Sequence, residues 1–144
     1  MNAHVQRGFT MVELMIVVVI VSILATVAVP SYRNYVTRAR ITEAVGGLSD
    51  MRVKMERHFQ DNRTYVGACA AGTQAPLPAA TATFTFSCTN LAGSTYTVLA
   101  TGTGAMTGFV FGIDQDNVRQ TASVPAGWTL PATNCWVLST GGAC

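Results

Sequence analysis

The chain has 144 residues, which is enough for one small domain and an extension. Its formal net charge of +2 at pH 7 is too small to argue for nucleic-acid binding by itself. No charged residue lies between Arg63 and Asp114, and this stretch is rich in Thr, Ala, Gly and Ser. Such a composition suits a small β domain with neutral walls that pack against neighbouring molecules.

The first element in chain order is an apolar segment, residues 9–29, whose only ionisable side chain is Glu13. About 20 residues at about 1.5 Å each suffice for a helix to cross a bilayer. The polar segment 1–8 carries one fixed positive charge, Arg7, and basic residues favour the cytoplasmic side of a membrane. We therefore expect residues 1–8 in the cytoplasm and the C-terminal part of the chain to be exported.

Two simpler readings of this segment are a secretory signal peptide and a plain membrane anchor. Residues 26–28, Thr-Val-Ala, offer a passable signal-peptidase site. Glu13 argues against both readings, because a charge near the centre of a membrane helix costs about 2.5–3.5 kcal/mol. The helical pattern also continues through Pro30, where a cleaved signal peptide would be followed by a loop.

The hexapeptide from Gly8 to Glu13, GFTMVE, resembles the processing motif of type IV pilins and type II secretion pseudopilins. The resemblance implies that a prepilin peptidase cuts between Gly8 and Phe9, removing residues 1–8, and that the new N-terminal Phe9 is methylated. Glu13 and Pro30 also stand where that family has a glutamate and a proline. The resemblance covers roughly the first third of the chain.

Glu13 has a physical role that follows from its position. Cleavage leaves an ammonium on Phe9, one helical turn from Glu13, and an unpaired charge among apolar helices is costly. The Glu13 carboxylate can therefore pair with the amine of its own chain or of a neighbouring subunit. Pairing with a neighbour would set the axial register of assembly.

Residues 30–62 are predicted to continue the helix as an amphipathic half. Pro30 should kink it, the pair 46–47 (Gly-Gly) should weaken it, and it should end near residues 61–62. An apolar stripe at three- and four-residue steps predicts the face that packs on the rest of the domain. The stripe comprises Tyr32, Tyr35, Val36, Ala39, Leu48, Met51, Met55 and Phe59.

Residues 63–144 are predicted to form a β-rich head. After a loop at 67–82, candidate strands cover residues 83–87, 96–101, 108–113 and, more weakly, 118–122. Residues 114–117, DQDN, favour a hairpin turn over a calcium loop. The predicted fold is α+β, one long helix packed on an antiparallel sheet of three to four strands.

The four cysteines lie in the head, and their even number in an exported chain favours two disulfides over a zinc site. Three connectivities are possible. The favoured one joins neighbours, Cys69 with Cys88 and Cys135 with Cys144, and closes loops of roughly 10–20 residues. Trp128 and Trp136 are expected in the core.

The expected function is that of a structural subunit of a type IV pilus, waiting in the inner membrane with its head in the periplasm and ending in the extracellular filament. Expected partners are other pilin subunits, the prepilin peptidase, the inner-membrane assembly machinery and, before assembly, membrane lipid. The alternatives are a type II secretion pseudopilin and a minor pilin that acts as a DNA-uptake receptor. The DNA receptor ranks last because the head offers only Arg119 beyond Arg63, so nucleic acid is not an expected partner.

Catalysis is not expected. The sequence contains no nucleophile elbow, P-loop, metal-ligand spacing or paired-carboxylate motif, so neither an enzyme activity nor a cofactor or metal is predicted.

Overall fold

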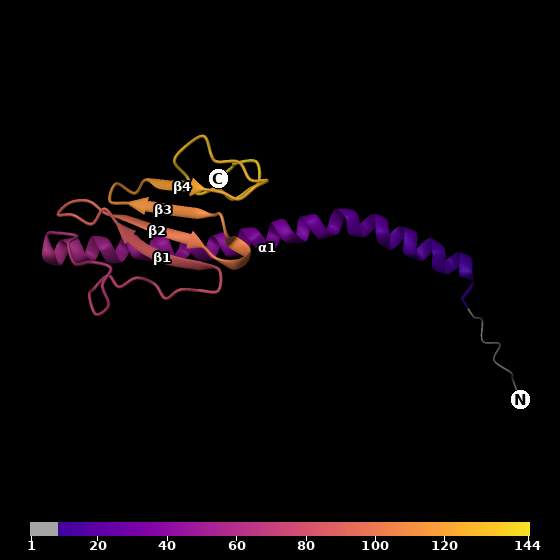
Figure 1. Ribbon diagram of the computed structural model, residues 1–144, viewed down its shortest axis with the longest axis horizontal. Helices are drawn as coiled ribbons and strands as arrows, with labels where there is room; N and C mark the ends of the chain where they lie inside the picture. The colour runs from indigo at the N-terminus through magenta and orange to yellow at the C-terminus, as the bar shows by residue number, and fades with distance from the viewer. Residues whose placement is uncertain (1–8) are drawn as a thin grey trace, which may run out of the picture. The chain divides into compact units, whose positions relative to one another are not determined.

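A computed structural model describes residues 9–144 of the chain (Figure 1). The chain divides into two compact units, Met1–Val36 and Thr37–Cys144, and the boundary falls inside one helix. The architecture is α+β, as predicted. The elements are α1 (Met11–Asn62), β1 (Phe84–Thr89), β2 (Thr97–Gly102), the 3₁₀ turn η1 (Gly104–Met106), β3 (Val110–Asp114) and β4 (Arg119–Ser123).

The four strands form one antiparallel sheet in the order β1-β2-β3-β4 (Figure 1). Every neighbour in the sheet is also a neighbour in sequence, so each pair is a hairpin. All four predicted strands are present, and their ends differ from the prediction by one or two residues. The β3–β4 register shifts between Val110 and Phe111.

The turn between β3 and β4 is held by its own aspartate. One carboxylate oxygen of Asp114 accepts hydrogen bonds from the backbone N–H of Asp116 (3.0 Å) and of Val118 (2.9 Å). Asn117 adopts a positive φ of 60°, which Asn tolerates better than most residues. The predicted hairpin turn is therefore confirmed, and its carboxylate is engaged by backbone donors.

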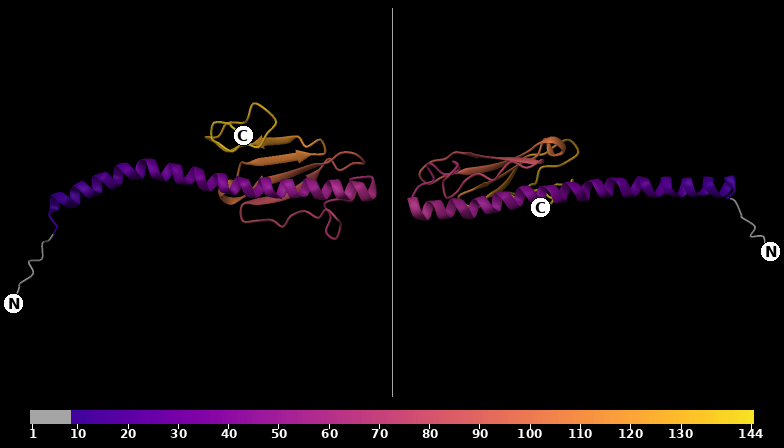
Figure 2. Two further views of the ribbon diagram at one scale, coloured as in Figure 1. Left: turned by 180° about the vertical axis from the view of Figure 1, so that it is seen from behind. Right: turned by 90° about the horizontal axis from the view of Figure 1, so that it is seen from below.

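Within the second unit the sheet lies against one face of α1 (Figure 2). From the helix, Ile41, Leu48 and Met51 are fully buried, and the sheet contributes Phe84 and Phe111. With Ala44 and Met55, the buried residues of α1 recur at steps of three and four, as a helix-on-sheet core requires. In β1 and β2 the more buried residues alternate with more exposed ones, so each of these two strands turns one face inward.

An aromatic cluster closes the end of the head near the helix C-terminus. The ring of Tyr65 stacks on Phe59 and meets Tyr96 edge-on, each at a centroid distance of 4.7 Å. Burial raises the pKa of Tyr96 to about 12, because the phenolate would lose its hydration there. Both tyrosines therefore act as neutral core residues at ordinary pH.

The predicted apolar stripe of the helix is correct only in its C-terminal part. Leu48, Met51 and Met55 are buried, whereas Tyr32 is 69% exposed and Tyr35 is 71% exposed. The buried face begins at Ile41 and includes a histidine, His58, whose Nε2 has no hydrogen-bond partner in the described part of the chain. Apolar periodicity marked the stripe, but only contact with the sheet decides which of its members are covered.

The Gly46–Gly47 pair does not interrupt α1, and the two glycines differ in their surroundings. A Cβ placed on Gly47 would lie 2.5 Å from Cζ of Phe86 in β1, whereas one on Gly46 would meet nothing within 4 Å. Gly47 therefore allows the sheet to approach the helix closely, and Gly46 has no such role.

We expect opposite effects from alanine at these two positions. Gly46→Ala should stabilise the head by up to about 1 kcal/mol, because alanine is the better helix former. Gly47→Ala should destabilise it by about 1–3 kcal/mol, because Phe86 must shift in a packed interface. Urea unfolding of the two variants beside the wild type measures both changes, and equal effects would contradict the close-approach role of Gly47.

Candidate processing and assembly site

The first turn of α1 contains a capping box built from Thr10 and Glu13. The Glu13 carboxylate accepts hydrogen bonds from the Thr10 backbone N–H (2.9 Å) and hydroxyl (2.8 Å), and the Thr10 hydroxyl accepts one from the Glu13 N–H (3.2 Å). Because α1 begins at Met11, Thr10 is the N-cap and Glu13 the third residue of the helix. The spacing Thr-x-x-Glu carries this signal in the sequence, but the role of Thr10 was not predicted.

The capping box gives Glu13 two hydrogen-bond donors within its own chain. A carboxylate at a helix N-terminus is also favoured by the helix dipole. The charge of Glu13 is therefore partly satisfied before any second subunit arrives. Phe9, four residues before Glu13, is 85% exposed. Gly8 and the rest of the predicted leader 1–8 lie outside the described residues.

The helix from Met11 through Val29 exposes its apolar side chains on every side. By length and composition α1 contains a segment apolar enough to cross a membrane, and none of that segment is buried. Its hydroxyl groups are satisfied within the helix, since Ser22 donates to the Val18 carbonyl and Thr26 to the Ile23 carbonyl, each at 2.7 Å. Such internal bonding is what a lipid environment demands of polar groups.

Pro30 lies inside α1, and the helix continues through it. Proline has no N–H, so the bond that this residue would normally give to the carbonyl of Thr26 cannot form. The predicted kink at Pro30 stays a prediction.

In the head the cysteines are paired between sequence neighbours. Cys69 is bonded to Cys88 and Cys135 to Cys144, with Cα–Cα distances of 6.4 and 6.1 Å. This is the connectivity that the sequence favours. Cys69 and Cys88 also pack against the buried core, so the first crosslink joins the loop after α1 to the first strand.

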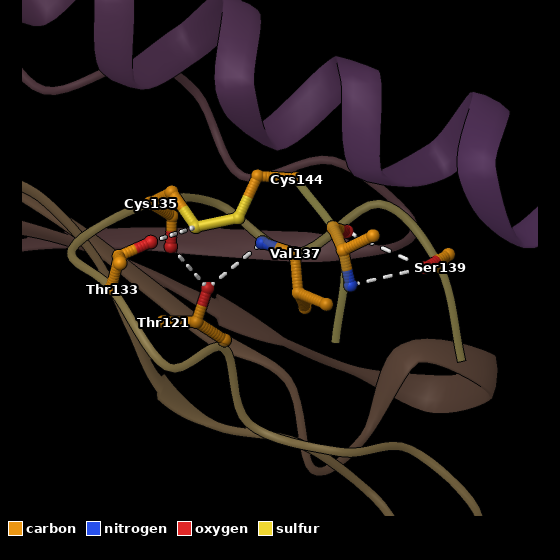
Figure 3. The surroundings of a disulfide bond; sticks show 7 residues. Thr121, Thr133, Cys135, Val137, Ser139 and Cys144 are labelled. Atoms are coloured by element: carbon orange, nitrogen blue, oxygen red, sulfur yellow. Dashed lines mark hydrogen bonds between the residues drawn. A yellow bond between two sulfur atoms is a disulfide. The ribbon is translucent and has the colours of Figure 1, made fainter. Parts of the chain in front are cut away.

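The second crosslink lies in a tail fastened to β4 (Figure 3). The Thr121 hydroxyl donates to the Cys135 carbonyl (2.8 Å) and accepts from the Val137 N–H (3.0 Å). One side chain therefore bonds the backbone of the tail at two points. In the same region the Trp136 indole N–H donates to the Gly112 carbonyl at 2.9 Å, and Trp136 is 7% exposed, which confirms its core position.

An exposed arginine, Arg119, covers the buried Trp136 beside this tail. The Arg119 guanidinium stands over the Trp136 ring, 5.0 Å from its centroid. Next to it is a groove of about 290 Å³, lined by Val45, Ser49, Arg119, Cys135, Trp136, Leu138 and Cys144. Trp128, the other predicted core tryptophan, is half-buried and meets Phe109 edge-on at 4.8 Å. Within residues 9–144 no cluster of His, Cys, Asp and Glu could hold a metal ion.

Residues 30–109 of the chain match the protein family described as "Type IV minor pilin ComP, DNA uptake sequence receptor", and this range is more than half of the sequence. The chain belongs to this ComP family of type IV minor pilins. Residues 4–29 independently match the prokaryotic N-terminal methylation motif. The resemblance inferred from the GFTMVE hexapeptide is therefore confirmed, and the ComP family is a structural one.

Curated relatives of this ComP-family pilin are fimbrial proteins. The chain is 40% identical over 67 residues to the type IV major fimbrial protein FimA of Dichelobacter nodosus, which covers 46% of this chain and 42% of that protein. It is 40% identical to fimbrial proteins of Moraxella nonliquefaciens over 65 residues (45% and 41%) and of Pseudomonas aeruginosa over 63 residues (44% and 41%). The chain thus spans less than half of the length of these relatives.

Proposed function

We propose that this chain is a filament subunit of a type IV pilus, stored in the inner membrane with its head in the periplasm and assembled through its N-terminal helix. The observation that carries this proposal is a capped carboxylate, Glu13, at the start of an apolar helical segment that is exposed on every side. A soluble domain gains nothing from such a helix. A helical bundle of identical subunits gains both apolar packing and a charge with which to set register.

The proposed assembly step exchanges partners at Glu13. After cleavage Phe9 carries an ammonium, and Glu13 lies one turn away from it. In the membrane, Thr10 donates two hydrogen bonds to the carboxylate. In the filament, the ammonium of a neighbouring subunit is a stronger partner in low dielectric, because charge pairing adds to hydrogen bonding.

Processing tests the proposal directly. We expect Gly8→Val to leave the leader attached, because a branched side chain replaces the glycine that precedes the proposed cleavage point. Ala3→Val, which introduces the same residue elsewhere in the leader, should be cleaved normally. Intact-mass measurement of membrane-extracted protein distinguishes the products. A mature N-terminus near Val29 would show a signal peptide and overturn the proposal.

DNA reception is the second candidate function. The ComP family is described as a DNA uptake sequence receptor, and the family match covers the helix and the first two strands of the head. The structure also supports it through Arg119, an exposed cation at the groove beside the tail. Exposed arginines contact DNA phosphates, whereas Trp136 beneath Arg119 is buried and offers no ring face for a base. DNA reception is therefore the second candidate function after that of a filament subunit.

We expect the head fragment from residue 30 onward to bind duplex DNA at about 150 mM salt if this second function holds. Arg119→Gln should lower the slope of log affinity against log salt by about 1, because one phosphate contact is lost. Arg119→Lys keeps the charge and should keep the slope. Absence of any mobility shift for the wild-type head would remove the DNA function and leave the filament function untouched.

A further inference from the structure

Two exposed tyrosines and an exposed arginine follow the apolar span. Tyr32 and Tyr35 are 69% and 71% exposed, although both are large aromatic residues. They are three residues apart on α1 and therefore share one side of it. Arg33 between them is exposed and makes no ion pair in the described part of the chain. We call Tyr32, Arg33 and Tyr35 the anchor turn.

The length of the apolar span fixes the depth of the anchor turn in a membrane. At about 1.5 Å per residue, Tyr32 lies about 35 Å and Tyr35 about 39 Å along the helix from Phe9. The hydrocarbon core is about 30 Å thick, and the headgroup layers bring the bilayer to about 40–45 Å. With Phe9 at one edge of the hydrocarbon and the helix tilted by about 20°, Tyr32 and Tyr35 lie at depths of about 32 and 37 Å, within the opposite headgroup layer.

The chemistry of the anchor turn matches that layer. Tyrosine places an apolar ring toward the acyl chains and a hydroxyl in the polar zone, which is why it is enriched at membrane interfaces. Arginine in the same turn attracts anionic lipid headgroups. Between Glu13 and Glu43 the sequence contains no carboxylate, so nothing nearby on the chain neutralises Arg33.

We propose that the anchor turn binds the anionic phospholipid headgroups of the leaflet that faces the head, and so sets the depth of the stored subunit. This inference rests on the membrane residence proposed above. A second copy of the chain is the weaker partner, because it presents the same uncompensated Arg33 at the same height. Lipid phosphate offers the opposite charge at that depth. Extraction of a subunit must then break these contacts as well as the apolar ones.

Fluorine NMR of the full-length chain in nanodiscs tests this inference. All four tyrosines are labelled with fluorotyrosine and assigned with single Tyr→Phe variants. A spin label on the lipid headgroup should broaden Tyr32 and Tyr35 strongly. Tyr65 and Tyr96, 5% and 2% exposed in the head core, should stay sharp and serve as internal references.

Charge recognition is tested in the same sample. Spin-labelled phosphatidylglycerol should broaden Tyr35 more than spin-labelled phosphatidylcholine does, and Arg33→Gln should reduce that preference by up to about fivefold. Arg57→Gln, which removes an exposed arginine near the C-terminal end of α1, should leave the preference for phosphatidylglycerol unchanged. Equal broadening by both lipids in the wild type would refute the anionic recognition.

The remaining outcomes separate this inference from the proposed function. If the chain co-elutes with nanodiscs but only an acyl-chain label broadens the two tyrosines, or no label does, the depth assignment is wrong and membrane storage stands. If the chain does not co-elute with nanodiscs at all, membrane storage fails and the anchor turn fails with it.

Discussion

Glu13→Val is expected to remain inserted and cleaved yet to be almost absent from pili. Removing a charge from the apolar segment favours membrane residence, so insertion should not suffer. In the filament, however, the ammonium of a neighbouring Phe9 loses its counter-charge. Breaking a buried ion pair costs about 3–5 kcal/mol, which corresponds to a decrease in incorporation of about a hundredfold or more. Immunoblots of sheared pili and of membranes from the same cells measure the two pools.

Ser22→Val is the matched control for this experiment. It places the same residue in the same apolar segment, but the Ser22 hydroxyl is already satisfied by the Val18 carbonyl of its own helix. Its incorporation into pili should stay close to that of the wild type. Normal incorporation of Glu13→Val would show that this carboxylate does not set register.

The two disulfides should contribute unequally to the stability of the head. Their sequence separations of 19 and 9 residues by themselves predict a difference of less than about 1 kcal/mol in the chain-entropy model. The Cys69–Cys88 pair, however, also packs against the core, and the Cys69 sulfur lies 3.8 Å from the Met55 sulfur. Removing it therefore loses packing as well as the crosslink.

We expect Cys69→Ala/Cys88→Ala to lower the free energy of unfolding by about 4 kcal/mol, and Cys135→Ala/Cys144→Ala by about 2 kcal/mol. Urea unfolding of the head fragment from residue 30 onward, checked as a monomer by size exclusion with light scattering, gives both values. A larger loss from the Cys135–Cys144 pair would mean that the tail, and not the core crosslink, limits the stability of the head.

Much of the fold was predictable because its signals are local. The apolar run and the Gly8–Glu13 hexapeptide predicted a membrane-capable helix, and the family match to residues 4–29 agrees with that motif. Alternating β-formers separated by turn residues predicted the four strands, since each hairpin joins neighbours in sequence. The neighbouring cysteines similarly favoured the pairing that the structure contains.

Other features depended on contacts between distant segments. The position of Arg119 over the Trp136 ring was not predictable from local signals, because the pair forms only when the tail folds back along β4. A count of basic residues in sequence therefore could not place Arg119 at the groove beside the tail. The capping role of Thr10 has a local signal, Thr-x-x-Glu, but this signal overlaps the processing motif, which by itself accounts for Glu13.

The sequence by itself determined the elements of this ComP-family pilin, because hydrophobic period, helix length and turn chemistry act within a few residues. Only the tertiary structure decided which side chains those elements cover. It buries Ile41 and His58 while leaving Tyr32 and Tyr35 exposed, and it assigns Gly47 but not Gly46 to the contact with Phe86. The physical reason is that burial is a property of two surfaces, and the second surface here is a sheet formed far along the chain.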